Sequence, residues 1–190
     1  KLKIIDVGCG LGHMLFALKV YGYENIRGID LSSESVSFCN KRGFMVEKGD
    51  LLTFFETNTE RYDVIIMNDI IEHIKKENII PCLKSCYNAL NSGGLLMIKT
   101  FNSANAILGL DARYTDFTHE VGFNQMSLKQ VLILSGFAPD KINVFPSHLY
   151  VYFNNPLNYV AWFLNSCLNL IFKFYFVLNG RLVSSIFTKN

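Results

Sequence analysis

The stretch DVGCGLGHML, residues 6–15, follows the apolar run KLKII and has glycine at three alternate positions. Glycine tolerates positive φ and lets the backbone approach a ligand without an intervening Cβ. The helix expected after this turn points its positive N-terminal end at the same place, which favours an anionic or zwitterionic ligand. We therefore predict a buried strand over residues 1–8, a ligand-binding turn, and a helix that Gly22 ends.

The next hundred residues continue this alternation of strand and helix. Such spacing predicts right-handed crossovers and a mostly parallel, doubly wound α/β sheet covered by helices on both faces. A polar loop follows at 102–126, and then a helix in which Ser127 and Gln130 have capping-box spacing. The other predicted strands are 25–31, 43–51, 62–69, 95–101 and 141–153, and the other predicted helices are 33–42 and 76–94.

The composition is that of a folded domain. Half of the 190 residues are apolar, 18% are charged and the net charge is +2, which fits a single domain over residues 1–190. The basic residues are scattered, so no nucleic-acid partner is expected. Five cysteines without a C-x-x-C pair favour a reducing, cytoplasmic setting. Cys82 and Cys86 share a helix face but have no nearby His or carboxylate, so no metal site is predicted.

Acidic and polar residues stand where the predicted strands end. Asp30 closes the second strand, where a carboxylate can accept both hydroxyls of a ribose. His13 stands where a dinucleotide fingerprint requires its last glycine, which weakens an NAD interpretation. Asp50 can accept from the amine of an adenine, Leu51 can flank its ring, and Asn68 ends the fourth strand beside the same crevice.

Five segments in register, DVGCGLG, GIDLS, KGDL, YDVIIMNDIIEHI and LNSGGLLMIKT, resemble the motifs of class I methyltransferases that use S-adenosylmethionine. The resemblance implies a Rossmann-like sheet of seven strands, with residues 1–101 as the cofactor-binding half. It also implies that the chain is truncated at both ends, with 184–190 beginning the last strand. The cofactor-binding residues it implies are Asp6 behind the amino group, Gly8, Cys9 and Gly10 along the methionine part, Asp30 and Leu31 at the ribose, Asp50 and Leu51 at the adenine, and Asn68 near the sulfonium.

The acceptor site is expected in the region 102–155, where RYTDFTHE occupies residues 113–120. His119 is the candidate general base, because an ordinary imidazole is mostly neutral at pH 7. Asp116 or Glu120 can orient its ring, and Arg113 can bind an anionic group of the acceptor, with Tyr114 and Glu120 beside it. The competing interpretation is a solvated loop whose charges pair with one another.

The sequence contains three other histidines. His73 competes for the role of base and is interpreted as part of the pocket floor, and His13 and His148 are treated as structural. The loop at 113–120 resembles one in methyltransferases of bacterial surface-glycan gene sets, which implies a sugar hydroxyl as acceptor. Methylation of a quinone-like ring oxygen or carbon, and a non-catalytic cofactor-binding module, stay open as alternatives.

An apolar segment follows at 156–178. Its residues 157–178 are numerous enough to span a bilayer as a helix. Asn165, Asn169 and Lys173 form a polar stripe on that helix, which argues against a lone membrane span. We expect a lid, a helix in the membrane interface at the inner face of the membrane, or a dimer contact.

Overall fold

The computed structural model describes residues 1–105, 109–145, 160, 163–164, 166–168 and 170–171. Its centre is a five-stranded sheet in the order β3-β2-β1-β4-β5, and every neighbouring pair of strands is parallel. This order places β1 and β4 in the middle and confirms the predicted α/β class. The strands are β1 (Ile4–Val7), β2 (Ile26–Asp30), β3 (Val46–Lys48), β4 (Tyr62–Asn68) and β5 (Leu90–Lys99).

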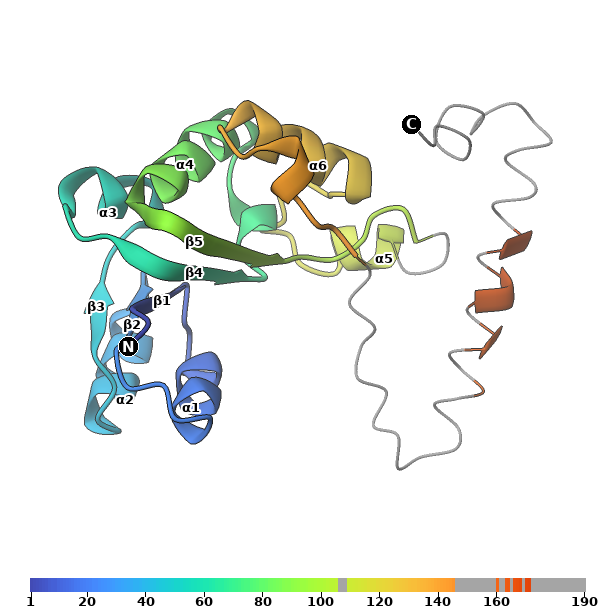
Figure 1. The fold of residues 1–190 in the computed structure, drawn as a ribbon. Coiled ribbons are helices and arrows are strands. Elements are labelled where there is room, and N and C mark those ends of the chain that lie inside the picture. The colour runs from blue at the N-terminus through green and yellow to red at the C-terminus, as the bar shows by residue number, and fades with distance from the viewer. Residues whose placement is uncertain (106–108, 146–159, 161–162, 165, 169, 172–190) are drawn as a thin grey trace.

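Helices cover both faces of this sheet, as the parallel topology requires. Helices α1 and α2 lie on one side, and α3, α4 and α6 lie on the other (Figure 1). Two short 3-10 turns, η1 and η2, complete the described elements. The bounds are α1 (His13–Val20), α2 (Ser33–Lys41), α3 (Leu51–Thr57), η1 (Ile71–His73), α4 (Lys76–Ala89), α5 (Gly109–Tyr114), α6 (Gln125–Leu134) and η2 (Pro139–Lys141).

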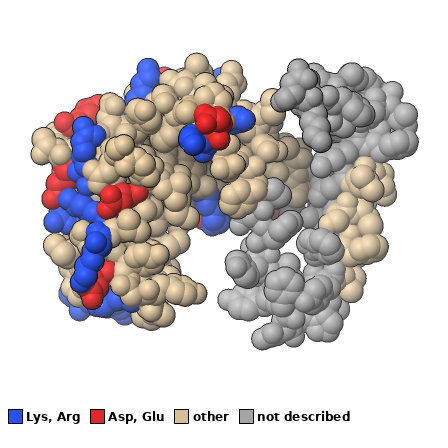
Figure 2. All heavy atoms as spheres, viewed as in Figure 1, with Lys and Arg blue, Asp and Glu red and all other residues tan. Residues whose placement is uncertain are grey.

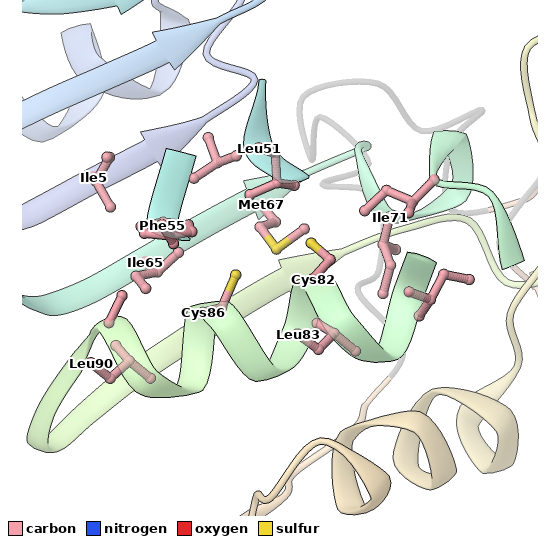
Figure 3. Close-up of a cluster of buried hydrophobic side chains, with 14 of the residues drawn as sticks. Ile5, Leu51, Phe55, Ile65, Met67, Ile71, Cys82, Leu83, Cys86 and Leu90 are labelled. Carbon is pink, nitrogen blue, oxygen red and sulfur yellow. The ribbon is translucent and has the colours of Figure 1, made fainter. Parts of the chain in front are cut away.

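The larger of two hydrophobic clusters lies between the sheet and α3, α4 and α6. Figure 3 shows α4 directing Cys82 and Cys86 toward side chains of the strands, and Leu83 is buried in the same cluster. Residues three and four positions apart share one face of a helix, and this face of α4 is fully buried. Cys82 and Cys86 therefore act as small apolar core residues, and both are free thiols.

Intermixed charges lie near the amino-terminal ends of β1, β2 and β4. Glu60 forms ion pairs with Lys3 and Arg27. Its Oε2 lies 3.0 Å from Nζ of Lys3 and 3.0 Å from Nη1 of Arg27. Figure 2 shows basic and acidic side chains interspersed on this side of the molecule. The adjoining strand β3 has only three residues and carries Glu47 and Lys48. Short, charged edge strands discourage edge-to-edge pairing with other chains.

Two predicted elements differ in the structure. The predicted strand 43–51 is formed only at Val46–Lys48, and helix α3 begins at Leu51. Asp50 causes this change, because its side chain accepts a hydrogen bond from the N–H of Leu52 and caps the helix. The predicted helix 76–94 ends at Ala89, and β5 already begins at Leu90. A shift of register between β4 and β5 accommodates Asn91–Gly94 within that strand.

The acceptor-side region is more ordered than a loop. Helix α5 forms inside the segment predicted as loop, and it contains Arg113 and Tyr114. Helix α6 begins at Gln125, because Asn124 and Ser127 cap it reciprocally rather than Ser127 and Gln130. The predicted strand 141–153 is not formed at 142–145, and its remaining residues lie outside the described part of the chain.

Most of the apolar segment 157–178 lies outside the described residues. The described positions 160, 163–164, 166–168 and 170–171 are helical. The expected last strand at 184–190 also lies outside them. Where the structure describes the chain, it contains no helix long and apolar enough to cross a bilayer. The lid, membrane-interface and dimer interpretations stay predictions.

Candidate cofactor and acceptor site

The glycine loop between β1 and α1 requires glycine for two separate reasons. Gly8, Gly10 and Gly12 have φ of 67°, 52° and 78°, a region that other residues rarely adopt. A Cβ on Gly8 would lie 2.1 Å from Cδ1 of Ile70, and one on Gly12 would lie 2.9 Å from Sγ of Cys39. The loop therefore packs directly against the turn that follows β4.

Asp30 ties this loop to the end of β2. Its Oδ2 accepts a hydrogen bond from the N–H of Gly10 at 2.7 Å, and its Oδ1 accepts one from the N–H of Ser32 at 2.9 Å. The N–H groups of Gly8 and Cys9 both donate to the carbonyl oxygen of Ile29, at 2.8 and 3.0 Å. The structure thus brings together the two segments that the sequence analysis assigned to one ligand.

Asp6 lies behind the loop on β1 and is almost completely buried, with 3% of its surface exposed. Burial, together with a smaller contribution from the nearby charge of Asp30, raises the pKa of its carboxyl to about 7. A cation placed beside Asp6 would reverse this effect, because it would stabilise the carboxylate. Burial also raises the pKa of the Cys9 thiol to about 12, so Cys9 is a packing residue without nucleophilic character.

The residues predicted at the adenine and ribose lie at or just after the carboxyl ends of β2 and β3. The N–H of Gly49 donates to the carbonyl oxygen of Asp30 at 3.1 Å, which places Asp50 beside the end of β2. Leu31 is exposed, whereas Leu51 is buried in the larger core cluster. Asn68 ends β4 and is paired in register with Lys99 of β5.

The acceptor loop differs in one respect from the prediction. Neither Asp116 nor Glu120 orients His119, whose Nδ1 lies 2.9 Å from the carbonyl oxygen of Ala112. Asp116 instead accepts hydrogen bonds from the N–H and the hydroxyl of Thr118, at 2.8 and 2.7 Å. The backbone and hydroxyl bonds of Thr118 lower the pKa of the Asp116 carboxyl, so this residue is ionised at neutral pH.

The rest of the loop is joined to the main fold by its backbone. The N–H groups of Glu120 and Val121 donate to the carbonyl oxygen of Glu72, at 2.8 and 3.2 Å. Arg113 donates from its guanidinium to the carbonyl oxygen of Glu120 at 2.8 Å. Its guanidinium lies 5.3 Å from the centre of the exposed Tyr114 ring. The competing prediction of charges that pair with one another is not supported for Arg113, which contacts a carbonyl.

Glu72 and His73, which follow β4, lie beside His119 of the acceptor loop. Glu72 is 1% exposed, and its Oε2 accepts no hydrogen bond from any described residue. Burial raises the pKa of this carboxyl. The rings of His73 and His119 lie with their centres 4.7 Å apart. The sequence analysis assigned no role to Glu72. The feature of the sequence that could have indicated such a role is the adjacent pair Glu72 and His73, which follows the end of β4.

Comparison with known proteins agrees with this geometry. The sequence model described as "Methyltransferase domain" matches residues 1–142, which is most of the chain. The chain belongs to the methyltransferase-domain family. The predicted class is therefore confirmed at the level of the family.

Similar proteins with curated names are more distant. The phosphoethanolamine N-methyltransferase of Plasmodium falciparum is 33% identical over 107 residues, which are 52% of this chain and 39% of that protein. The ubiquinone biosynthesis O-methyltransferase of Glaesserella parasuis is 27% identical over 110 residues, 53% of this chain and 45% of that protein. The methyltransferase chain thus spans less than half the length of these two relatives.

Solved structures share the fold. A SAM-dependent methyltransferase from Archaeoglobus fulgidus superposes with a TM-score of 0.67 at 23% identity, over 88% of this chain and 79% of that one. An S-adenosylmethionine-dependent methyltransferase from Mesorhizobium loti gives a TM-score of 0.60 at 19% identity, over 72% and 74% of the two chains. These similarities confirm the Rossmann-like methyltransferase fold.

Replacement of Gly8 by Ala tests the packing of the glycine loop. We expect Gly8→Ala to lower the free energy of unfolding by more than about 2 kcal/mol, because a left-handed conformation costs an L-residue about 1–2 kcal/mol and the added methyl also meets Ile70. Gly43→Ala is the matched control, with φ of 77° and no atom within 4 Å of the added carbon. Urea unfolding of both variants measures the difference. Equal losses in the two variants would show that the loop does not pack against Ile70.

Proposed function

We propose that this domain binds S-adenosylmethionine and transfers its methyl group to a hydroxyl of an acceptor molecule. The observation that carries the proposal is the glycine loop, joined through Gly10 and Asp30 to the end of β2. Ligands of parallel α/β sheets bind beyond the carboxyl ends of the strands, where this loop and the acceptor loop both lie. Family membership supports the same activity.

The charges around the loop suit a cationic cofactor. S-adenosylmethionine carries an ammonium and a sulfonium group, and Asp6 and Asp30 are the acidic residues beside the loop. We assign Asp6 to the support of the ammonium group and Asp30, with Leu31, to the ribose. Gly8, Cys9 and Gly10 line the methionine part, Asp50 and Leu51 the adenine, and Asn68 the sulfonium side.

The acceptor is assigned to the space beside His119. Methyl transfer from a sulfonium is an in-line displacement: the acceptor oxygen forms a bond to the methyl carbon while the carbon–sulfur bond breaks. The neutral thioether leaves without an acid, so the protein has to align the hydroxyl and accept its proton. The carbonyl of Ala112 fixes the His119 ring through Nδ1, which directs the second ring nitrogen away from that carbonyl.

We assign the acceptor to a sugar hydroxyl of a cell-surface glycan or glycolipid. The support is the RYTDFTHE sequence at 113–120. Its first and last residues are joined, because Arg113 donates to the carbonyl oxygen of Glu120, and the Arg113 guanidinium lies near the Tyr114 ring. A membrane-interface position of residues 157–178 on the cytoplasmic side would suit a lipid-linked acceptor. The second candidate is a quinone-like ring hydroxyl, which the name of the Glaesserella parasuis relative favours.

The raised pKa of Asp6 predicts a pH-dependent affinity for S-adenosylmethionine. A carboxyl with a folded pKa of about 7 is protonated at pH 5, and binding the ammonium group requires it to lose that proton. The affinity should therefore rise by up to about tenfold per pH unit between pH 5 and 7 and level off above. Calorimetric titrations at several pH values measure this slope.

The Asp6→Asn variant is the control for this prediction. It should bind weakly at pH 8 and show little change in affinity between pH 5 and 7. In the ligand-free wild type, the folded pKa lies above the unfolded value, so stability falls as pH rises from about 4 to about 7, and Asp6→Asn should remove this fall. A wild-type affinity slope equal to that of Asp6→Asn would exclude Asp6 from cofactor binding.

A transfer assay tests the proposed activity. Methyl-labelled S-adenosylmethionine is incubated with the protein and a cell-envelope extract, which is then separated into glycan, glycolipid and quinone fractions. We expect label in the glycan or glycolipid fraction. His119→Ala should reduce this label by about 10²- to 10⁴-fold, while His13→Ala, an exposed histidine on α1, should retain it.

Label in the quinone fraction alone would replace the sugar by the second candidate acceptor. Tight binding of the cofactor without transfer to any fraction would contradict the proposed activity and indicate a non-catalytic binding module. Full turnover by His119→Ala would exclude His119 from the reaction.

A further inference from the structure

Three side chains that metal ions commonly use converge beside the acceptor loop. Glu72, His73 and His119 each offer one ligand atom, and these atoms lie within 4.8 Å of one another. Glu72 and His73 belong to η1, whereas His119 comes from the loop after α5. The hydrogen bonds from Glu120 and Val121 to the Glu72 carbonyl hold the two segments together.

The hydrogen bonds of His119 leave one ring nitrogen free to bind an ion. Nδ1 lies 2.9 Å from the carbonyl oxygen of Ala112. A carbonyl only accepts, so Nδ1 carries the proton and donates, and Nε2 keeps its lone pair. The Phe101 ring packs on the same imidazole, with ring centres 5.0 Å apart. The ring is thus held in one orientation.

His73 is placed in the same tautomer by a different partner. Thr118 donates its only hydroxyl proton to Oδ1 of Asp116, at 2.7 Å. The 2.9 Å contact between His73 Nδ1 and Thr118 Oγ1 is therefore a bond that His73 donates. Nε2 of His73 keeps its lone pair. Metal-binding histidines characteristically donate their other ring nitrogen to a carbonyl, carboxylate or hydroxyl in this way.

Glu72 supplies the independent observation. Its side chain is almost wholly buried, and Oε2 has no hydrogen-bond partner of good geometry among the described residues. The Thr100 hydroxyl, which also lacks such a partner, lies close enough to lower the pKa of this carboxyl but does not satisfy Oε2. A buried carboxylate without a partner is strongly destabilising, and pairing or metal coordination removes that cost. A cation held between Glu72 and the two Nε2 atoms would supply the missing partner.

We propose that Glu72, His73 and His119 bind a divalent transition-metal ion through one carboxylate oxygen and two imidazole Nε2 atoms. Two histidines and one carboxylate suit Zn²⁺, Mn²⁺ or Fe²⁺, whereas Mg²⁺ and Ca²⁺ prefer oxygen ligands alone. Metal–ligand bonds of about 2.0–2.2 Å require these ligand atoms to move closer together than the 4.8 Å within which they now lie. Three protein ligands leave coordination positions open for another molecule.

The site lies next to the proposed cofactor loop, because Ile70, two residues before Glu72, contacts Gly8. The role of the ion rests on the proposed function. An acceptor hydroxyl bound at an open position would lose its proton more easily and would be held in place for attack on the methyl group. His119 would then act by holding the ion instead of taking the proton itself.

Cobalt binding tests the site without reference to methyl transfer. The full chain is freed of metal with a chelator and titrated with Co²⁺, whose visible absorption reports imidazole coordination, and then with Zn²⁺ in competition. We expect one equivalent to bind. Glu72→Gln, His73→Ala and His119→Ala should each weaken binding by at least about 100-fold, since loss of even a supporting partner costs about 10- to 100-fold.

His13→Ala and Glu77→Gln are the matched controls, because both residues are exposed and lie outside the cluster. Both should bind Co²⁺ like the wild type, and Glu72→Gln, which preserves shape, should unfold at a temperature no lower than the metal-free wild type. The proposal is overturned if the wild type binds no Co²⁺, Mn²⁺ or Zn²⁺, or if the three variants bind like the controls.

The outcome is separable from that of the proposed function. Calorimetry with S-adenosylmethionine on the metal-free protein reports cofactor binding alone. A bound ion without methyl transfer would support the metal site and count against the proposed activity. Full methyl transfer by metal-free protein in the presence of chelator, with no Co²⁺ bound, would overturn the metal site and leave the proposed activity standing.

Discussion

The carboxylate of Asp30 accepts hydrogen bonds from the N–H groups of Gly10 and Ser32, and the organisation of the site depends on these two bonds. They hold the glycine loop against the end of β2, and Ser32 is also the N-cap of α2. The three positive φ angles of the loop are compatible with this arrangement only because the residues are glycine. A Cβ at Gly8 would also displace Ile70, so the loop further fixes the turn after β4.

That turn connects the cofactor side to the acceptor side. Ile70 touches the glycine loop, and Glu72, two residues later, accepts backbone hydrogen bonds from Glu120 and Val121. A short segment therefore positions the acceptor loop relative to the proposed methyl donor. One buried acidic residue lies on each of these two sides. Asp6 lies behind the loop and Glu72 lies under the acceptor site, and burial raises the pKa of both. In the proposed site, each would be stabilised by a cation: the ammonium of the cofactor for Asp6, and a metal ion for Glu72.

Local sequence patterns predicted the parts of the fold that depend on local physics. The alternation of apolar runs with glycine-ended helices indicated all five strands of the described sheet. The spacing of Gly10 and Asp30 predicted that they lie together, and they are hydrogen-bonded to each other; that they share a ligand stays a prediction. Helix α3 was missed because the predicted strand was extended through Asp50 to residue 51, although aspartate is a common helix cap. The cluster of Glu72, His73 and His119 depends on tertiary hydrogen bonds between segments far apart in sequence. Cysteine spacing predicted no metal site, and although the adjacent Glu72 and His73 are visible in the sequence, their approach to His119 is not.

Calorimetric titration of the full chain with S-adenosylhomocysteine, the thioether product of the proposed reaction, and separately with NAD, tests the central claim most directly. We expect one equivalent of S-adenosylhomocysteine to bind and NAD to produce no binding heat, because His13 stands where a dinucleotide loop requires glycine. Saturable binding of NAD together with no binding of S-adenosylhomocysteine would contradict the assignment of the glycine loop to a methyl donor.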